Sequence, residues 1–203
     1  MSQFERTALL LGEEAIESLS RKKVAIFGLG GVGSWCCEAL GRAGVGQLAL
    51  IDHDTVSESN LNRQFFFRDQ LGMQKVDALA ENLRRINPDV KLELHNTRVT
   101  AENIHEIFDG CDLFLEAFDA ADSKTLFVRE LLPLGRPVVA ASGLAGWGRS
   151  NSMQVRKVGA NLYLAGDLTS GIGGELTPQS ARVGIAAAQE ANTALALILG
   201  REI

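Results

Sequence analysis

The sequence predicts an α/β fold: a Rossmann-like, doubly wound, mainly parallel sheet with a C-terminal antiparallel hairpin extension. Three observations lead to this fold class. An apolar run, residues 23–27, passes through a glycine-rich turn into a helix-like stretch. Strand-like and helix-like segments then alternate as far as residue 141, which is the pattern of βαβ units. Two later strand-like runs flank Gly159, which indicates a hairpin.

Each element follows from the spacing of its apolar residues. After the first strand at 23–27, strands are expected at 47–51, 90–94, 112–117 and 137–141, and hairpin strands at 152–157 and 161–164. Helices are expected at 32–43, 73–86, 101–108, 123–134 and 181–200. Thr100 and Asp122 precede two of these helices and have the side chains that N-caps prefer.

The length of the chain favours a single domain over residues 1–203. We expect three parts within it. A helical arm occupies 1–20, with one continuous helix from residue 7. A Rossmann core occupies 23–142. An extension over 143–203 contains the hairpin, a glycine-rich loop and the C-terminal helix.

Composition bounds the possible functions. The chain is 46% hydrophobic, and its net charge of −5 provides no basic footprint, so nucleic acid is an unexpected partner. The three cysteines, Cys36, Cys37 and Cys111, form no CxxC pair, so no zinc site is expected, and buried reduced thiols favour a cytoplasmic protein. We find no signal peptide and no membrane span in the sequence.

The glycine-rich turn is the first candidate site. Gly28, Gly30 and Gly33 have the G-x-G-x-x-G spacing, with Gly31 beside them. Such a turn lets backbone N–H groups approach a phosphate at the positive end of the following helix. A tight strand-to-helix turn without a ligand is the alternative, but the acid at Asp52 completes the nucleotide-binding pattern.

Acids follow two of the predicted strands. Asp52 and Asp54 end the second strand, and Asp119 follows the fourth. Ligands of open α/β sheets bind at the carboxyl ends of strands. A carboxylate there suits ribose hydroxyl groups or, beside phosphates, Mg²⁺.

A polar loop over 55–64 leaves the same edge of the sheet. Arg63 in this loop carries a permanently charged guanidinium that suits phosphate oxygens. Lys75 falls in the first turn of a helix, where the helix dipole disfavours a cation, so a phosphate partner explains it better than helix stability does. A plain surface lysine is the alternative.

Five segments together resemble a known family: Gly28–Gly33, Asp52–Asp54, Ser59–Gln64, Gly72–Lys75 and Phe118–Asp119. The chain is similar over nearly its whole length to the ubiquitin-activating-type adenylyltransferases of the ThiF, MoeB and HesA type. Within them it most resembles the short-form sulfur-carrier enzymes of thiamine biosynthesis. The resemblance implies a nucleotidyltransferase that uses ATP and Mg²⁺ without zinc. Its substrate would be the C-terminal Gly-Gly carboxylate of a ubiquitin-like sulfur carrier protein, which it converts to an acyl-adenylate with release of pyrophosphate.

The resemblance also implies roles for individual residues. Arg63 and Lys75 would contact the phosphates, Asp119 would bind Mg²⁺ and Asp52 the ribose. Asn60 and Gln64 would hold the loop and add polar phosphate contacts. Arg6 would reach the γ-phosphate of a partner subunit, which implies a homodimer in which this arginine is catalytic.

Other functions stay open. Phe4-Glu5-Arg6-Thr7 and Leu11-Gly12-Glu13 also resemble tRNA threonylcarbamoyladenosine dehydratases, against which we weigh the acidic net charge and the carrier-type C-terminal half. An NAD-dependent dehydrogenase shares the glycine turn and Asp52 but has no use for Arg63, Lys75 and Asp119 together. A non-catalytic scaffold has no need of Arg63 or Asp119. Ala120 departs from the family, which often has Asn at this position.

Overall fold

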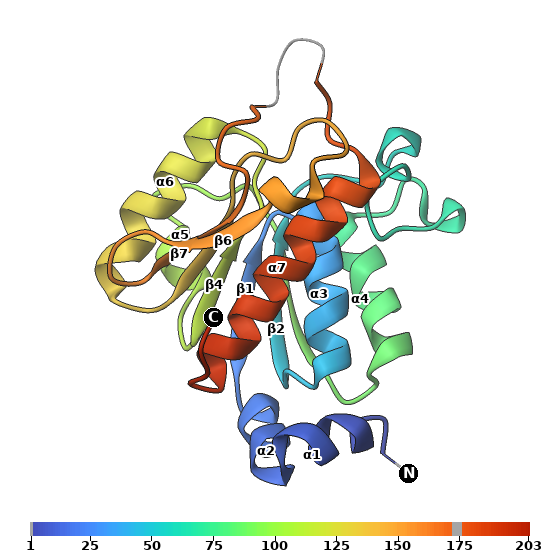
Figure 1. Ribbon diagram of the computed structural model, residues 1–203. Coiled ribbons are helices and arrows are strands. Elements are labelled where there is room, and N and C mark those ends of the chain that lie inside the picture. The colour runs from blue at the N-terminus through green and yellow to red at the C-terminus, as the bar shows by residue number, and fades with distance from the viewer. Residues whose placement is uncertain (1, 172–175) are drawn as a thin grey trace.

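One seven-stranded sheet organises the molecule (Figure 1). The computed structural model describes residues 2–171 and 176–203. The strand order is β3-β2-β1-β4-β5-β7-β6, and all neighbouring strands are parallel except β6 and β7, which form the antiparallel pair. The predicted fold class is therefore confirmed. Residues 172–175, which belong to the glycine-rich loop expected in the extension, lie outside the described residues.

The elements lie close to their predicted positions. The strands are β1 (Lys23–Phe27), β2 (Gln47–Asp52), β3 (Lys91–Asn96), β4 (Leu113–Glu116), β5 (Val138–Ala141), β6 (Gln154–Lys157) and β7 (Leu162–Gly166). The helices are α1 (Glu5–Leu11), α2 (Glu13–Ser20), α3 (Gly31–Ala43), α4 (Lys75–Ile86), α5 (Ile104–Ile107), α6 (Ala121–Leu131) and α7 (Ser180–Ile198).

The central strand β1 shows why the sheet is covered on both faces. Successive side chains of a strand point to opposite faces. Val24 and Ile26 belong to one apolar core with residues of α3, α4 and α7. Ala25 and Phe27 belong to a second core with residues of α5 and α6. A strand buried on both faces is apolar throughout, which is why its sequence reads as a continuous run.

Three local predictions were wrong. Gly12 divides the expected helix over 7–20 into α1 and α2, because it adopts φ 89° and ψ 157°, outside the helical region. Thr100 does not cap a helix: α5 begins at Ile104, and the backbone N–H of Thr100 instead donates to Oδ1 of Asn103 at 2.8 Å. Asp122 lies inside the first turn of α6, where its charge complements the helix dipole.

The arm of α1 and α2 lies beneath the amino ends of the strands, far from the loops that follow their carboxyl ends (Figure 1).

All three cysteines are free and buried. Among the helices of residues 2–171 and 176–203, none is both long and apolar enough to cross a membrane.

Candidate nucleotide site

A cavity of about 380 Å³ opens at the carboxyl ends of β1, β2 and β4. This position follows from the topology, since the strand order reverses between β1 and β4 and open α/β sheets leave a crevice there. Its lining contains most of the predicted site residues and several others: Gly28, Gly30, Gly31, Val32, Ile51, Asp52, His53, Asp54, Arg63, Gln64, Lys75, Thr97, Arg98, Val99, Ala117, Phe118, Asp119, Ala120, Ser123, Ala141, Leu144, Pro178 and Val183.

The glycine-rich turn lines the bottom of this cavity. Its glycines differ in whether the structure has space for a side chain. A Cβ at Gly33 would lie 1.9 Å from the carbonyl oxygen of Gly28, and a Cβ at Gly28, whose φ is +90°, would lie 2.8 Å from that of Ala117. A Cβ at Gly31 would meet Val183 at 2.7 Å. Packing explains these three. At Gly30 the nearest atom is 3.8 Å away, so this glycine leaves room for a ligand.

The N-terminus of α3 follows the turn directly. This helix has no acidic residue in its first turn, so its positive end is not neutralised locally. A phosphate beside Gly30 would therefore meet both free space and a favourable field.

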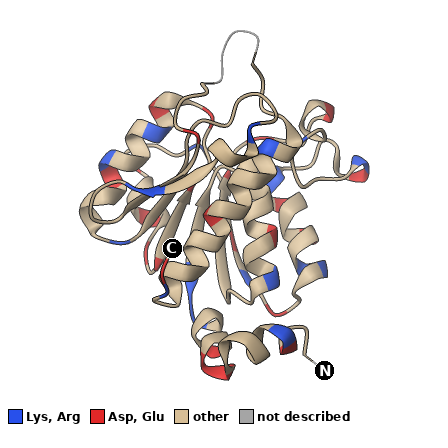
Figure 2. Ribbon diagram, in the orientation of Figure 1, with Lys and Arg blue, Asp and Glu red and all other residues tan. Residues whose placement is uncertain are grey.

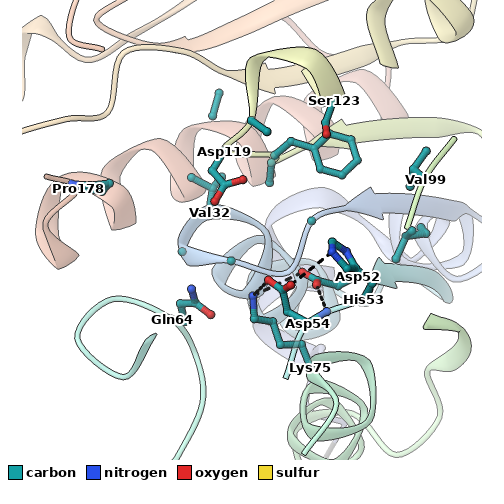
Figure 3. A pocket seen from close by; sticks show the side chains of 18 of the residues that line it. Val32, Asp52, His53, Asp54, Gln64, Lys75, Val99, Asp119, Ser123 and Pro178 are labelled. Carbon is teal, nitrogen blue, oxygen red and sulfur yellow. Dashed lines mark hydrogen bonds and ion pairs between the residues drawn. The ribbon is translucent and has the colours of Figure 1, made fainter. Parts of the chain in front are cut away.

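Asp52, Asp54 and Lys75 form a charged group at one side of the cavity (Figure 3). The two oxygens of Asp52 accept the backbone N–H groups of Leu29 at 2.7 Å and Asp54 at 2.8 Å. Lys75 Nζ lies 2.7 Å from Asp54 Oδ2 and 3.8 Å from Asp52 Oδ2, and its side chain is only 6% exposed. Lys75 is therefore no ordinary surface lysine.

Lys75 changes the pKa of Asp54. Partial burial opposes ionisation of this carboxyl, but the hydrogen bond and charge of Lys75 outweigh it and hold the pKa of Asp54 below its usual value. The Asp54 carboxyl is thus ionised at neutral pH. The ammonium has three donors, so it can keep Asp54 and still donate to a phosphate oxygen.

The polar loop brings Arg63 and Gln64 to the cavity but leaves Asn60 outside its lining. Asn60 accepts the backbone N–H of Ser57 through Oδ1 at 3.1 Å and so holds the loop. One guanidinium nitrogen of Arg63 donates to Asn62 Oδ1 at 2.8 Å and to the carbonyl of Ser59 at 3.3 Å, within its own loop. Gln64 is buried, and its Oε1 has no hydrogen-bond partner in the described part of the chain.

Asp119 approaches the cavity from the opposite side of the glycine-rich turn (Figure 3). It follows β4, which pairs with β1. No hydrogen bond or ion pair joins Asp119 to another residue within 2–171 or 176–203, so its oxygens remain available to a ligand. An accessible carboxylate beside a phosphate site fits Mg²⁺, which takes few protein oxygens and keeps its other contacts to waters and phosphates.

Three predicted site residues do not line the cavity. Asn60 lies outside it, in the polar loop. Gly33 is buried in the turn below it. Arg6 is exposed on α1, at the other end of the sheet.

Sequence reasoning also missed several lining residues. Arg98 follows the end of β3, so the strand-end argument that found Asp52 could have found it too. Leu144 and Pro178 come from the extension, and only tertiary packing brings them to this edge.

Comparisons with known proteins give the chain its relatives. The profile of the ThiF family matches residues 4–200. The chain is 34% identical over 146 residues to the tRNA threonylcarbamoyladenosine dehydratase of Escherichia coli (strain K12), which covers 71% of this chain and 54% of that protein. It is 50% identical over 108 residues to Ubiquitin-like modifier-activating enzyme 5 of Drosophila willistoni, covering 53% of this chain and 25% of that one. The chain thus spans about half the length, or less, of these curated relatives.

A solved structure shares the fold. The crystal structure of Escherichia coli tRNA N6-threonylcarbamoyladenosine dehydratase in complex with ATP superposes with a TM-score of 0.89, covering 98% of this chain and 94% of that one at 24% identity.

These relatives overturn one sequence-based prediction. The expected adenylylation of a sulfur carrier in thiamine biosynthesis is wrong, because two curated bacterial relatives, 34% and 35% identical to this chain, and a solved structure with the same fold are tRNA threonylcarbamoyladenosine dehydratases. Basic and acidic residues are interspersed along the chain (Figure 2), so a total of −5 does not describe any one surface. Charged residues of both signs line the cavity: Arg63, Lys75, Arg98, Asp52, Asp54 and Asp119.

Proposed function

The chain belongs to the ThiF family, and we propose that it uses ATP to adenylate a carboxylate, that of threonylcarbamoyladenosine in tRNA. One observation carries the proposal. A single cavity collects a glycine turn with open space at Gly30, the cations Arg63 and Lys75, and the available carboxylate of Asp119. A hydride-transferring site has no use for the two cations and Asp119 together.

The residues of the cavity divide the work of binding ATP. Backbone N–H groups at Gly30 and the start of α3 would donate hydrogen bonds to phosphate oxygens. Asp52 would accept the ribose hydroxyl groups, since each of its oxygens keeps a lone pair after accepting one backbone N–H. Arg63 and Lys75 would stabilise charge that develops on the phosphate oxygens in the transition state.

Asp119 would hold Mg²⁺, which when bound supplies positive charge between phosphate oxygens. Replacing Asp119 with alanine should therefore reduce adenylation by about a hundredfold, a typical loss for one preorganised electrostatic group. Asp122→Ala is the matched control. This acid lies three residues away, is exposed in the first turn of α6 and does not line the cavity.

The chemistry of the acceptor is consistent with this cavity. A carboxylate oxygen of the threonyl group attacks the α-phosphorus of ATP, and pyrophosphate leaves. The resulting acyl-adenylate is open to attack by the neighbouring carbamoyl group, and AMP departs with the former carboxylate oxygen. The nucleoside thereby loses the elements of one water, and ATP becomes AMP and pyrophosphate.

The test presents the purified chain with ATP, Mg²⁺ and tRNA that carries threonylcarbamoyladenosine. We expect AMP formation that depends on the tRNA, and a product nucleoside lighter by one water in mass spectrometry. Transcribed tRNA without the modification is the control. Equal AMP formation with both tRNAs, or none with either, would exclude this acceptor.

A ubiquitin-like modifier is a second candidate acceptor, favoured by the 50% identity to Ubiquitin-like modifier-activating enzyme 5 over 108 residues. The same assay with a ubiquitin-like protein decides between the two. ATP–pyrophosphate exchange that requires the protein's free C-terminal carboxylate, and not the tRNA, would establish the second candidate.

A further inference from the structure

An ion pair with a buried carboxylate adjoins the segment that carries Asp119. Glu116, the last residue of β4, is 2% exposed. Lys124 of α6 donates to both of its carboxylate oxygens, at 2.9 Å and 3.0 Å. Burial raises the pKa of Glu116, and the charge of Lys124 opposes that rise. A second buried acid, Glu190, lies close enough for the charge of Glu116 to raise its pKa, in addition to the larger effect of burial.

Each partner of this pair also holds a backbone group at the cavity. Glu116 Oε1 accepts the backbone N–H of Phe118 at 2.7 Å. Lys124 Nζ donates to the carbonyl oxygen of Ala141 at 3.1 Å, at the end of β5. Residues 117–120 and Ala141 all line the cavity. The ammonium of Lys124 thus links the end of β4, through Glu116, to the end of β5, through Ala141. The segment that carries Asp119 follows β4 directly.

The stability of the fold is a poor explanation for the pair. The Glu116 carboxylate is almost fully buried, while the Lys124 side chain is 32% exposed, so the attraction between them mainly offsets the cost of taking one carboxylate out of water. Apolar residues of similar volume are often as stable. The pair is therefore better explained by the backbone groups that it holds in place, those of Phe118 and Ala141. A displacement of about 1 Å in a reacting group can cost roughly a hundredfold in rate.

We propose that Glu116 and Lys124 are positioning residues, which fix the 117–120 segment so that the Asp119 carboxylate meets the triphosphate. The inference rests on the proposed use of ATP. It adds two residues that touch neither nucleotide nor acceptor and act through the backbone of Phe118 and Ala141.

The decisive variant removes both charges, Glu116→Leu with Lys124→Met. It should fold, and should melt above the Lys124→Met single variant, which strands a buried carboxylate. We expect kcat for AMP formation to fall about tenfold or more while the KM for ATP changes less than about threefold, because the loss is in the transition state. Lys124→Arg, which keeps both donations, should restore most of kcat.

A matched control removes another ion pair of the sheet. Lys23 Nζ and Glu93 Oε2 lie 2.7 Å apart, and neither residue lines the cavity. The Lys23→Met, Glu93→Leu variant should leave kcat unchanged, whatever its effect on the melting temperature. An equal loss of kcat in this control would mean that the Glu116–Lys124 effect is general destabilisation, and would overturn the inference.

A second readout does not depend on activity. The amide of Phe118 should exchange its hydrogen faster in the Glu116→Leu, Lys124→Met variant than in the wild type. In the Lys23→Met, Glu93→Leu control it should exchange at the wild-type rate. A folded variant with unchanged Phe118 exchange and a kcat within about threefold of the wild type would also overturn the inference. If the wild-type protein forms no AMP, the proposed function fails, while the amide exchange of Phe118 still decides whether the pair fixes the 117–120 segment.

Discussion

At the residue scale, two glycines of the glycine-rich turn are explained differently, Gly33 by packing and Gly30 by ligand binding. Gly33 has no space for a side chain, since a Cβ would lie 1.9 Å from a carbonyl oxygen. Gly30 has space, and φ at this residue is −76°, so its backbone needs no positive dihedral. A glycine that neither packing nor φ requires is best explained by the close approach of a ligand.

We therefore expect Gly30→Ala to fold with a melting temperature close to that of the wild type and to bind ATP about tenfold more weakly or worse, because the methyl group occupies the space of a phosphate. Calorimetry with ATP measures the affinity. Gly33→Ala is the contrasting variant and should fail to fold. Wild-type ATP affinity in a folded Gly30→Ala protein would remove the phosphate from this turn.

The positions of Asp52 and Asp119 could be predicted from the sequence because the carboxyl ends of neighbouring parallel strands share one edge of a sheet. The partners of other residues could not. Nothing in the spacing of Lys75 and Asp54 indicates their ion pair, since a contact between residues 21 positions apart is decided by the fold. Asn60 was expected to hold the loop and to contact phosphate; it holds the loop, but it does not line the cavity.

At the element scale, a buried ion pair joins α7 to the segment that follows β7. Arg182 of α7 is 4% exposed, and it pairs with Asp167 just after β7. It also donates to the carbonyl oxygen of Gly148 at 2.8 Å, which ties the glycine-rich segment after β5 to the same helix. Burial opposes ionisation of Asp167, but N–H groups of Ser170 and Thr169 and the Arg182 charge lower its pKa to about 2.

This lowered pKa predicts a pH-dependent stability. A group whose pKa is lower in the folded state stabilises the fold above its unfolded pKa of about 3.9, and this contribution is lost as pH falls towards 2. Asp167→Asn should therefore destabilise the protein at pH 7 by about 3 kcal/mol, because it leaves Arg182 buried without a counter-charge. Urea unfolding should show the difference from the wild type shrinking below about pH 4. The exposed Asp89→Asn serves as control, and a constant difference at all pH values would contradict the account.

The break between α1 and α2 shows why element boundaries are harder to predict than elements. Leucines and other apolar residues continue at helical spacing through Gly12, so periodicity alone extends one helix from 7 to 20. The φ of 89° and ψ of 157° at Gly12 change the chain's direction without changing that periodicity. A glycine inside a helical pattern was the available signal.

At the scale of the whole molecule, the arm presents Arg6 at the end of the sheet opposite the cavity. Leu9 and Leu10 of the same helix are 82% and 81% exposed. We propose that the chain forms a homodimer in which this arm packs on a second copy and brings Arg6 to its triphosphate. An isologous contact exchanges the same residues in both directions, so each site would be completed by its partner.

Mixing two inactive variants tests this arrangement. In a dimer of one Arg6→Ala chain and one Asp119→Ala chain, one site lacks both groups and the other keeps both. Activity should return to about one quarter of the wild-type level after random exchange of subunits. No recovery, with subunit exchange demonstrated by tagged chains, would mean that Arg6 does not act across the dimer.

The central claim is that the cavity directs a carboxylate to the α-phosphorus of ATP, and the identity of the nucleotide product tests it most directly. The wild-type protein is incubated with Mg²⁺, ATP and tRNA carrying threonylcarbamoyladenosine, and the nucleotides are separated by chromatography. The account predicts AMP and pyrophosphate in equal amounts, and about a hundredfold less of both with Asp119→Ala. ADP and phosphate as the products would contradict it, because they require cleavage at the γ-phosphorus.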